Sequence, residues 1–263
     1  MTHILEGSVR RASGRARIAA QLIQVSDQSH LCAESYERDV GDILALQSDV
    51  AEAMIARQIQ IKLIPQERDR LAASSFVLPE AYEASLKGRY LWNQRMTDAL
   101  QKSIKYFEKA IQIDPAYAAA YAGMADSYLT LKDDGHLPTL RATAEAKRAA
   151  RKALHLDLML AEPHISLAHA YFHEFNWPAA EREFECGLEL NRNYAPGHFY
   201  YANYLLVMEQ FQDALAEARR AQALDPVSLS SGSNTAMALD YGRHYDQAIE
   251  QSLQVLEIDP KFA

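Results

Sequence analysis

The spacing of three Asp-Pro pairs constrains the fold of this chain more than any other feature. Each pair closes a run of small and apolar residues, and the pairs are Asp114-Pro115, Asp225-Pro226 and Asp259-Pro260. The second and third prolines are 34 residues apart, and the first and second are 111 apart, which is three such periods and nine residues. A period of 34 residues is typical of helix–turn–helix units that bury their apolar faces only against neighbouring units. The spacing therefore predicts a stack of helical hairpins with an irregular unit in it.

A frame of 34 residues divides the second half of the chain into regular units, 161–192, 195–226 and 229–260. Small residues recur where two antiparallel helices must approach, and large apolar residues recur where one hairpin meets the next. An aromatic residue begins the second helix of each unit, at Trp177, Phe211 and Tyr245. This pattern resembles that of tetratricopeptide repeats over roughly residues 79 to 263. The resemblance implies an α-solenoid of about five helix hairpins.

Two earlier units fit the frame less regularly. The unit 118–158 is nine residues too long, and we expect its surplus near Lys132 to Thr139, where Asp-Asp-Gly-His-Leu-Pro indicates a loop between the helices. The unit 79–115 carries about three extra residues near Asn93 to Thr97. The predicted array has five units, 79–115, 118–158, 161–192, 195–226 and 229–260, with the irregularity in the first two.

The first 78 residues have a different pattern. Residues 1–40 are rich in β-forming residues and contain a hairpin signal at Ser13-Gly14, and 31–37 is predicted as a third strand. From Asp42 to Leu63 the apolar period becomes helical, and 63–78 is predicted as a linker with a short helix that begins at Pro65. The chain is therefore expected to be mainly α, with a small amino-terminal α/β (β-β-β-α) block over residues 1–62.

This block resembles the later part of the TolB-like amino-terminal domain. The matching residues are Leu5 to Arg10, Arg17-Ile18, Gln21 to Ile23, Tyr36 to Arg38 and Asp42 to Gln47. Cys32 stands where that pattern usually has tryptophan. The resemblance implies a bacterial regulator, because this domain precedes tetratricopeptide repeats in many of them, including class III adenylate cyclases and winged-helix regulators.

Both ends of the sequence are expected to be cut. In TolB-like domains the first strands and helices lie upstream of such a block, and Ala263 stands at the first position of a sixth unit, three residues after Pro260. A repeat array needs a terminal helix with a polar outer face. We therefore expect a fragment of a longer protein.

Composition limits the function classes. The net charge of −8 and the pI near 5.6 argue against a general nucleic-acid binder. The sequence has no signal peptide and no apolar run long enough to span a bilayer. We expect a cytoplasmic location, or a periplasmic one if a membrane span lies upstream.

The candidate chemical motifs favour no catalytic, cofactor or metal site. The sequence has no Gly-rich phosphate loop, no Ser-His-Asp order and no catalytic cysteine context. His169 and His173, four residues apart, would share a helix face and could chelate a metal, but Glu174 follows the second histidine and no HExxH motif forms. Histidines that face solvent or a groove are the favoured interpretation. Asp133 and Asp134 could bind a cation, but acids in such a loop are more often simply solvated.

A binding groove is the better candidate. In tetratricopeptide arrays the first helix of each unit lines the concave surface, which implies a partner-binding groove formed by Asp126, Ile165, His169, Phe172, His173, Phe199, Asn203, Leu206, Met237 and Tyr241. This surface is apolar and aromatic and lacks the Lys and Arg residues with which chaperone-binding arrays hold a terminal carboxylate. It suits an apolar-faced helix or an extended peptide. The alternative is that a segment of the same chain, such as the TolB-like block, covers some of these residues.

The sequence therefore predicts a non-enzymatic protein–protein interaction scaffold or sensor module of a bacterial signalling or regulatory protein. Two alternatives stay open: the regulatory region of a class III adenylate cyclase, or that of a winged-helix transcription regulator, with the output domain outside this sequence. A homo-oligomer is a further expectation, because Ile249, Leu253 and Leu256 would form an uncapped apolar face on the last repeat.

Overall fold

The computed structural model describes residues 3–12, 15–24, 30–39 and 77–260. The chain divides into two compact units, Met1–Glu83 and Ala84–Ala263. The helix expected over 42–63, and all but the last two residues of the linker expected over 63–78, lie outside the described residues.

The first unit contains a three-stranded antiparallel sheet in the order β1-β2-β3. The strands are β1 (His3–Ala12), β2 (Arg15–Gln24) and β3 (His30–Asp39). Polar pairs join neighbouring strands on an exposed face: Arg17 Nε donates to Ser35 Oγ at 2.8 Å, and Gln21 Nε2 donates to Glu6 Oε2 at 2.8 Å. Such cross-strand pairs stabilise a sheet with a solvated face. The three strands confirm the predicted β-β-β part of the amino-terminal block, and β1 ends before and β2 begins after Ser13-Gly14, where the sequence predicts a hairpin.

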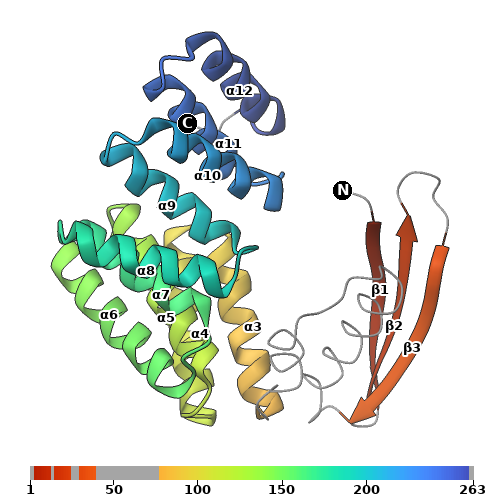
Figure 1. Cartoon of the computed structure of the whole chain (residues 1–263). Helices are drawn as coiled ribbons and strands as arrows, with labels where there is room; N and C mark the ends of the chain where they lie inside the picture. The colour runs from red at the N-terminus through yellow and green to blue at the C-terminus, as the bar shows by residue number, and fades with distance from the viewer. Residues whose placement is uncertain (1–2, 13–14, 25–29, 40–76, 261–263) are drawn as a thin grey trace. The chain divides into compact units, whose positions relative to one another are not determined.

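From Pro79 onward the described residues form helices in antiparallel pairs (Figure 1). The helices are α3 (Pro79–Asn93), α4 (Thr97–Ile113), α5 (Ala118–Asp133), α6 (Thr139–Leu156), α7 (Ala161–His173), α8 (Trp177–Leu190), α9 (Ala195–Val207), α10 (Phe211–Leu224), α11 (Leu229–Tyr241) and α12 (Tyr245–Ile258). Within this described part of the chain the pairs make five hairpins. The prediction of stacked helical hairpins is therefore confirmed.

Glycines allow the helices of the first two hairpins to approach closely. Phe107 of α4 is fully buried, and a Cβ added to Gly123 of α5 would lie 2.3 Å from its Cζ atom. A Cβ added to Gly88 of α3 would lie 2.9 Å from the same ring. One aromatic ring thus fills the space that two glycines leave, which is the dense packing expected of a protein interior.

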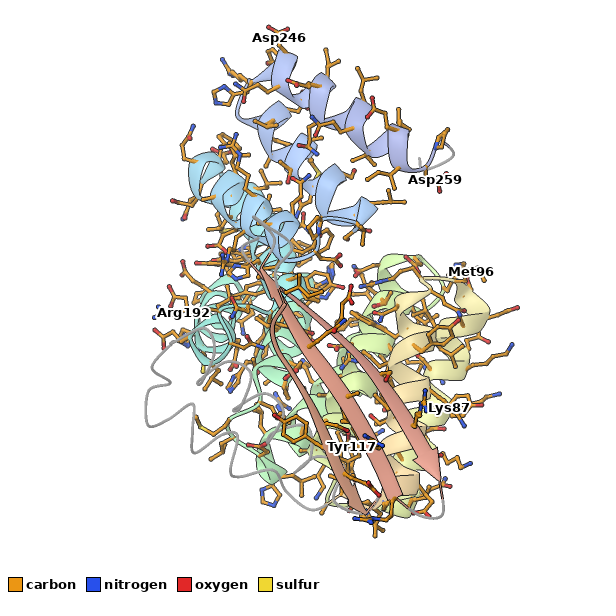
Figure 2. The ribbon with its side chains drawn as sticks, turned by 90° about the vertical axis from the view of Figure 1, so that its right-hand side faces the viewer. Lys87, Met96, Tyr117, Arg192, Asp246 and Asp259 are labelled. Carbon is orange, nitrogen blue, oxygen red and sulfur yellow. The ribbon has the colours of Figure 1, made fainter. Side chains whose placement is uncertain are left out.

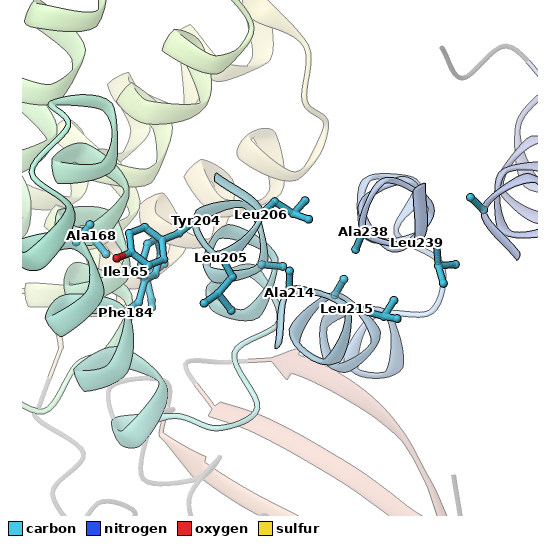
Figure 3. Packing of buried hydrophobic residues seen from close by; sticks show 14 residues of the cluster. Ile165, Ala168, Phe184, Tyr204, Leu205, Leu206, Ala214, Leu215, Ala238 and Leu239 are labelled. Carbon is cyan, nitrogen blue, oxygen red and sulfur yellow. The ribbon is translucent and has the colours of Figure 1, made fainter. Parts of the chain in front are cut away.

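One apolar cluster runs without interruption through the last three hairpins. Phe184 of α8 is fully buried, and its ring centroid lies 5.7 Å from that of Tyr204 of α9. Figure 3 shows how the buried side chains succeed one another from Ile165 to Leu239. Each hairpin buries its apolar face against the next one, so the array is stabilised mainly by contacts between neighbours.

The turn between the two helices of each regular hairpin contains a residue whose backbone is in the left-handed helical region. These residues are Phe175, Glu209 and Arg243, spaced by 34 residues, with φ angles of 60°, 61° and 62°. The next backbone N–H donates to a carbonyl five residues earlier, as from Gln210 to Leu205 at 2.9 Å. This is the Schellman arrangement of a helix C-terminus. A residue other than glycine costs roughly 1–2 kcal/mol there.

The surplus of the second hairpin lies mostly in its helices. α5 has 16 residues where α7, α9 and α11 have 13 each, and α6 has 18 where α8, α10 and α12 have 14 each. The connection 134–138 has five residues, against three in 174–176. The sequence predicts that the loop begins at Lys132, but it begins after Asp133, because Lys132 and Asp133 belong to the last turn of α5. The first hairpin behaves alike: α3 has 15 residues and α4 has 17, while its turn has only three.

The last helix presents apolar side chains to solvent. Ile249, Leu253 and Leu256 of α12 are 61%, 56% and 40% exposed. Figure 2 shows this helix between Asp246 and Asp259. Association of two copies through this face stays a prediction, which light scattering at increasing protein concentration tests.

Candidate binding surface

The first helices of successive hairpins are joined by polar contacts. Arg89 of α3 pairs with Asp126 of α5 at 2.9 Å, and Ser166 Oγ of α7 donates to the other oxygen of Asp126 at 2.6 Å. Burial alone would lower the pKa of Arg89, but Asp126 beside it raises that pKa above its ordinary value. Asp126 is buried with both carboxylate oxygens bonded, which is how a buried charge is tolerated. We call the surface formed by α3, α5, α7, α9 and α11 the first-helix surface.

A second set of contacts lies further along the same helices. Trp92 Nε1 of α3 donates to Thr130 Oγ1 of α5 at 2.9 Å, and Arg95 donates to the same oxygen at 3.2 Å. The Arg95 guanidinium lies 4.1 Å from the centroid of the Trp92 ring, within cation–π range. Burial raises the pKa of Tyr200 on α9 to about 12, although nearby Arg95 acts in the opposite direction. Arg95 therefore connects the end of α3 with both α5 and α9.

The last turns of α5 and α7 bring four ionisable side chains together. Asp133 of α5 lies 3.4 Å from His169 Nε2 and 3.2 Å from His173 Nε2, and the two histidine Nε2 atoms are 2.9 Å apart. Lys132 Nζ lies 2.8 Å from His173 Nε2. The His169 ring is buried and stacks on Tyr200, with centroids 4.0 Å apart. We call Asp133, His169 and His173 the Asp–His cluster.

The charges of the Asp–His cluster shift the pKa values within it. Burial alone would raise the pKa of Asp133, but His169, His173 and Lys132 together lower it well below its ordinary value. Burial lowers the pKa of His173, and the opposing effect of Asp133 does not cancel this. At neutral pH the cluster therefore contains an ionised carboxylate beside a His173 ring that favours its neutral form.

A pocket of about 530 Å³ opens beside these contacts. Its walls come from the end of α3, the start of α9 and the connection between α10 and α11, and they consist of Trp92, Asn93, Gln94, Arg95, Ala195, Pro196, Phe199, Tyr200, Asp225, Val227, Ser228, Leu229, Ser230 and Ser231. Aromatic and aliphatic walls with a few charged and hydroxyl groups are typical of ligand sites.

Comparison with known proteins identifies the fold. A thermophilic TPR protein of Thermus thermophilus matches 69% of this chain and 92% of its own, at 18% identity and a TM-score of 0.56. A chain of the APC/C hetero-tetramer Cut9–Hcn1 matches 82% of this chain and 43% of its own, at 15% identity and a TM-score of 0.51. The helical part of this chain is a tetratricopeptide-repeat solenoid.

One curated relative is similar in sequence. The putative adenylate cyclase 3 of Rhizobium meliloti (strain 1021) is 35% identical over 128 residues, which are 49% of this chain and 22% of that protein. The matched part is therefore about a fifth of the relative's length. No protein-family model matches the chain.

The predicted groove residues differ in how far the structure exposes their side chains. Met237 and Tyr241 of α11 are 39% and 55% exposed, and Phe172, His173, Phe199 and Asn203 are half-buried. Asp126 and His169 lie on the first-helix surface but are buried under their own contacts. Ile165 and Leu206 are 1% and 7% exposed and belong to the apolar cluster. These two must be removed from the groove, because the first helix of a repeat also packs against its partner helix and against neighbouring hairpins.

Sequence reasoning missed the part of the surface that α3 supplies. Arg89 and Trp92 are three residues apart and share one face of α3, and Arg95 lies in the turn just after that helix, with a φ of 53°. The sequence frame assigns groove positions only from the second hairpin onward, so it leaves these residues out. Arg89, Arg95 and Lys132 put three cationic groups on or beside the first-helix surface, which corrects the expectation that it lacks Lys and Arg.

A cysteine and a histidine also meet between α7 and α8. His164 Nδ1 lies 2.7 Å from Glu183, and its Nε2 atom lies 3.7 Å from Cys186 Sγ. Burial raises the pKa of the Cys186 thiol, and the charges of Glu183 and Glu189 raise it further. The thiolate is the reactive form, so this contact does not activate Cys186 as a nucleophile.

Within the described ranges, no helix combines the length and the apolar character that crossing a bilayer requires.

Proposed function

We propose that the solenoid is an interaction or sensor region that binds a peptide or protein segment on the first-helix surface. The pocket of about 530 Å³ carries this proposal, because its volume is in the range of specific ligand sites. At its rim, Trp92 Nε1 and Arg95 both donate to Thr130 Oγ1 and are held in place by it. A surface ordered in this way loses little conformational entropy when a ligand binds.

The walls of the pocket specify the chemistry of the ligand. Phe199 and Val227 offer apolar contact, Arg95 offers a cation, and Ser228 and Ser230 offer hydroxyl groups. We infer an extended segment with an apolar side chain next to a carboxylate or carbonyl group. Met237 and Tyr241 continue the apolar surface along α11, where flexible and aromatic side chains suit protein contacts.

The regulatory context is also a proposal. The sequence match to a putative adenylate cyclase and the TolB-like resemblance of residues 1–62 both favour a signalling protein. We propose that the chain is the regulatory part of a class III adenylate cyclase or, as the alternative, of a winged-helix transcription regulator. A cytoplasmic location belongs to the same proposal. The similar APC/C chain belongs to a hetero-tetramer, so a fold of this kind can take part in an assembly.

Peptide display on the purified chain tests the binding proposal. Selected peptides should bind in calorimetry, and Arg95→Ala and Phe199→Ala should each weaken them about tenfold, the effect of losing a central contact. Arg141→Ala and Leu140→Ala are matched controls, because both residues are exposed on α6, outside the first-helix surface. Equal affinity of all four variants for the selected peptides would remove the pocket as the binding site.

A further inference from the structure

The Asp–His cluster has the composition of a metal site. His169 and His173 stand four residues apart on one face of α7, and Asp133 reaches them from the last turn of α5. Each side chain offers one ligand atom, and these atoms lie within 4.8 Å of one another. Two imidazoles and a carboxylate are a recurrent ligand set for divalent transition metals.

The distances between the ligand atoms fit a single ion. The two Nε2 atoms are 2.9 Å apart, and the Asp133 oxygens lie 3.2 and 3.4 Å from His173 and His169. With metal–ligand bonds of about 2.0–2.2 Å, two ligand atoms are about 3.3–3.6 Å apart around a tetrahedral ion and about 2.8–3.1 Å apart around an octahedral one. Asp133 faces His173 with Oδ1 and His169 with Oδ2, and one atom from each of the three side chains lies within 4.8 Å of the others. The separations are therefore close to those around a single ion, and changes in side-chain torsion angles alone can bring the ligand atoms to it.

Packing orients the deepest ligand. His169 is 5% exposed, and its ring is stacked on Tyr200 with an interplanar angle of 29°. A ligand held by its surroundings binds a metal with less loss of side-chain freedom. The side chains of Asp133 and His173 are 31% and 17% exposed, so an ion has access from solvent.

Lys132 competes with an ion for the same acceptors. Its ammonium lies 2.8 Å from His173 Nε2 and 3.3 Å from Asp133 Oδ1. The side chain is long and flexible, so it can turn outward when a divalent cation repels it. This competition lowers metal affinity but shows that the acceptors attract a cation.

We propose that Asp133, His169 and His173 bind a divalent transition-metal ion, and that zinc fits them best. Imidazole ligands favour zinc over magnesium and calcium, which prefer oxygen ligands. Three protein ligands leave a coordination position for water or for a side chain of a bound partner. The ion joins the second hairpin to the third through the last turn of α5, which extends beyond the length of α7, α9 and α11.

Zinc titration of the untagged chain tests this site. Cys32→Ser and Cys186→Ser provide the background, so that no thiol contributes to binding. Calorimetry and competition with a chromophoric chelator should show one zinc ion per chain at micromolar zinc. Asp133→Asn and His173→Ala change the partly exposed ligands, which spares the buried His169. Each should weaken zinc binding by at least about tenfold, since even the loss of a residue that only orients a ligand costs roughly 10–100-fold.

Two further variants make the result specific. His164→Gln changes another histidine of α7, one that bonds Glu183, and should leave zinc affinity unchanged. Lys132→Gln should raise zinc affinity severalfold, because it removes the competing cation. Zinc should also raise the melting temperature of the background chain and not that of His173→Ala, provided that circular dichroism shows equal helicity.

Other outcomes would overturn the proposal. It fails if micromolar zinc does not bind, or if Asp133→Asn and His173→Ala bind zinc as tightly as the background chain. It also fails if His164→Gln loses as much affinity as they do. None of these measurements depends on peptide binding, so they leave the proposed function to its own test.

Discussion

Asp133 and His169 are 36 residues apart in the sequence, yet Oδ2 of the carboxylate lies 3.4 Å from Nε2 of the imidazole. The contact depends on the additional turn of α5, because a first helix of 13 residues like α7, α9 or α11 would end before Asp133. Irregular helix length in one repeat thus creates a cluster that a strictly periodic array would not contain.

The pair of Arg89 and Asp126 should be important for stability. Asp126→Ala leaves Arg89 without its carboxylate and Ser166 without its acceptor. We expect the free energy of unfolding to fall by about 2–4 kcal/mol. This is less than for a fully buried pair, because the Arg89 side chain is 32% exposed. Urea unfolding followed by circular dichroism measures it. Arg89→Met in the Asp126→Ala background should recover part of the loss. A loss below about 0.5 kcal/mol for Asp126→Ala would show that the pair is dispensable.

Gly123→Ala should destabilise the second hairpin. The new Cβ would lie 2.3 Å from Phe107 Cζ, so the ring must move within a dense core, at a cost of about 1–3 kcal/mol. Phe107→Leu combined with Gly123→Ala should cost less than the sum of the two single changes, because the smaller side chain removes the clash. Thermal unfolding of the four chains tests this, and simple additivity would argue against the close contact.

Glu209→Gly should stabilise the chain. Glu209 has a φ of 61° in the turn between α9 and α10 and is exposed, so glycine removes backbone strain without loss of packing. We expect a gain of about 0.5–1 kcal/mol after the larger entropy of glycine in the unfolded chain is counted. Gln212→Gly is the control, since it lies in the first turn of the exposed face of α10 and should cost up to about 1 kcal/mol. Destabilisation by Glu209→Gly would contradict the left-handed assignment.

Cys186 should react slowly with iodoacetamide at neutral pH. Burial, Glu183 and Glu189 raise the pKa of its thiol, so the thiolate fraction and the alkylation rate increase only at a higher pH than for a free cysteine. The measurement is the rate against pH in a Cys32→Ser chain, with glutathione as the reference. Glu183→Gln should move the midpoint toward lower pH. A midpoint below that of glutathione would contradict the raised pKa.

Much of the fold could be predicted from the sequence because a repeat encodes its structure locally. The aromatic residues Trp177 and Phe211 lie within one period of the rings they contact, Tyr204 and Tyr241, so the 34-residue frame locates them. The same frame did not predict where a helix ends in the hairpins whose helices are longer than those of the regular units. The sequence Lys132-Asp133 reads as the start of a loop, yet both residues continue α5, because a following glycine and proline end a helix without fixing the turn at which it ends.

The candidate site was predictable only in part. The frame placed His173, Phe199, Met237 and Tyr241 on first helices with accessible side chains, but it also assigned Ile165 and Leu206 to the groove, although both are buried between hairpins. A helical period shows which residues share a face. It does not show whether a neighbouring hairpin covers that face.

The sequence by itself determined the stack of hairpins and the pairing of His169 with His173 on one face of a helix, because both follow from spacing along a single chain segment. Only the tertiary structure decided that Arg89 bonds Asp126, that Arg95 borders a pocket with Phe199, and that Asp133 joins the two histidines. Contacts between hairpins depend on how far each helix extends and on how one hairpin is displaced against the next. A repeat period contains neither quantity, so these contacts appear only when the hairpins are packed together.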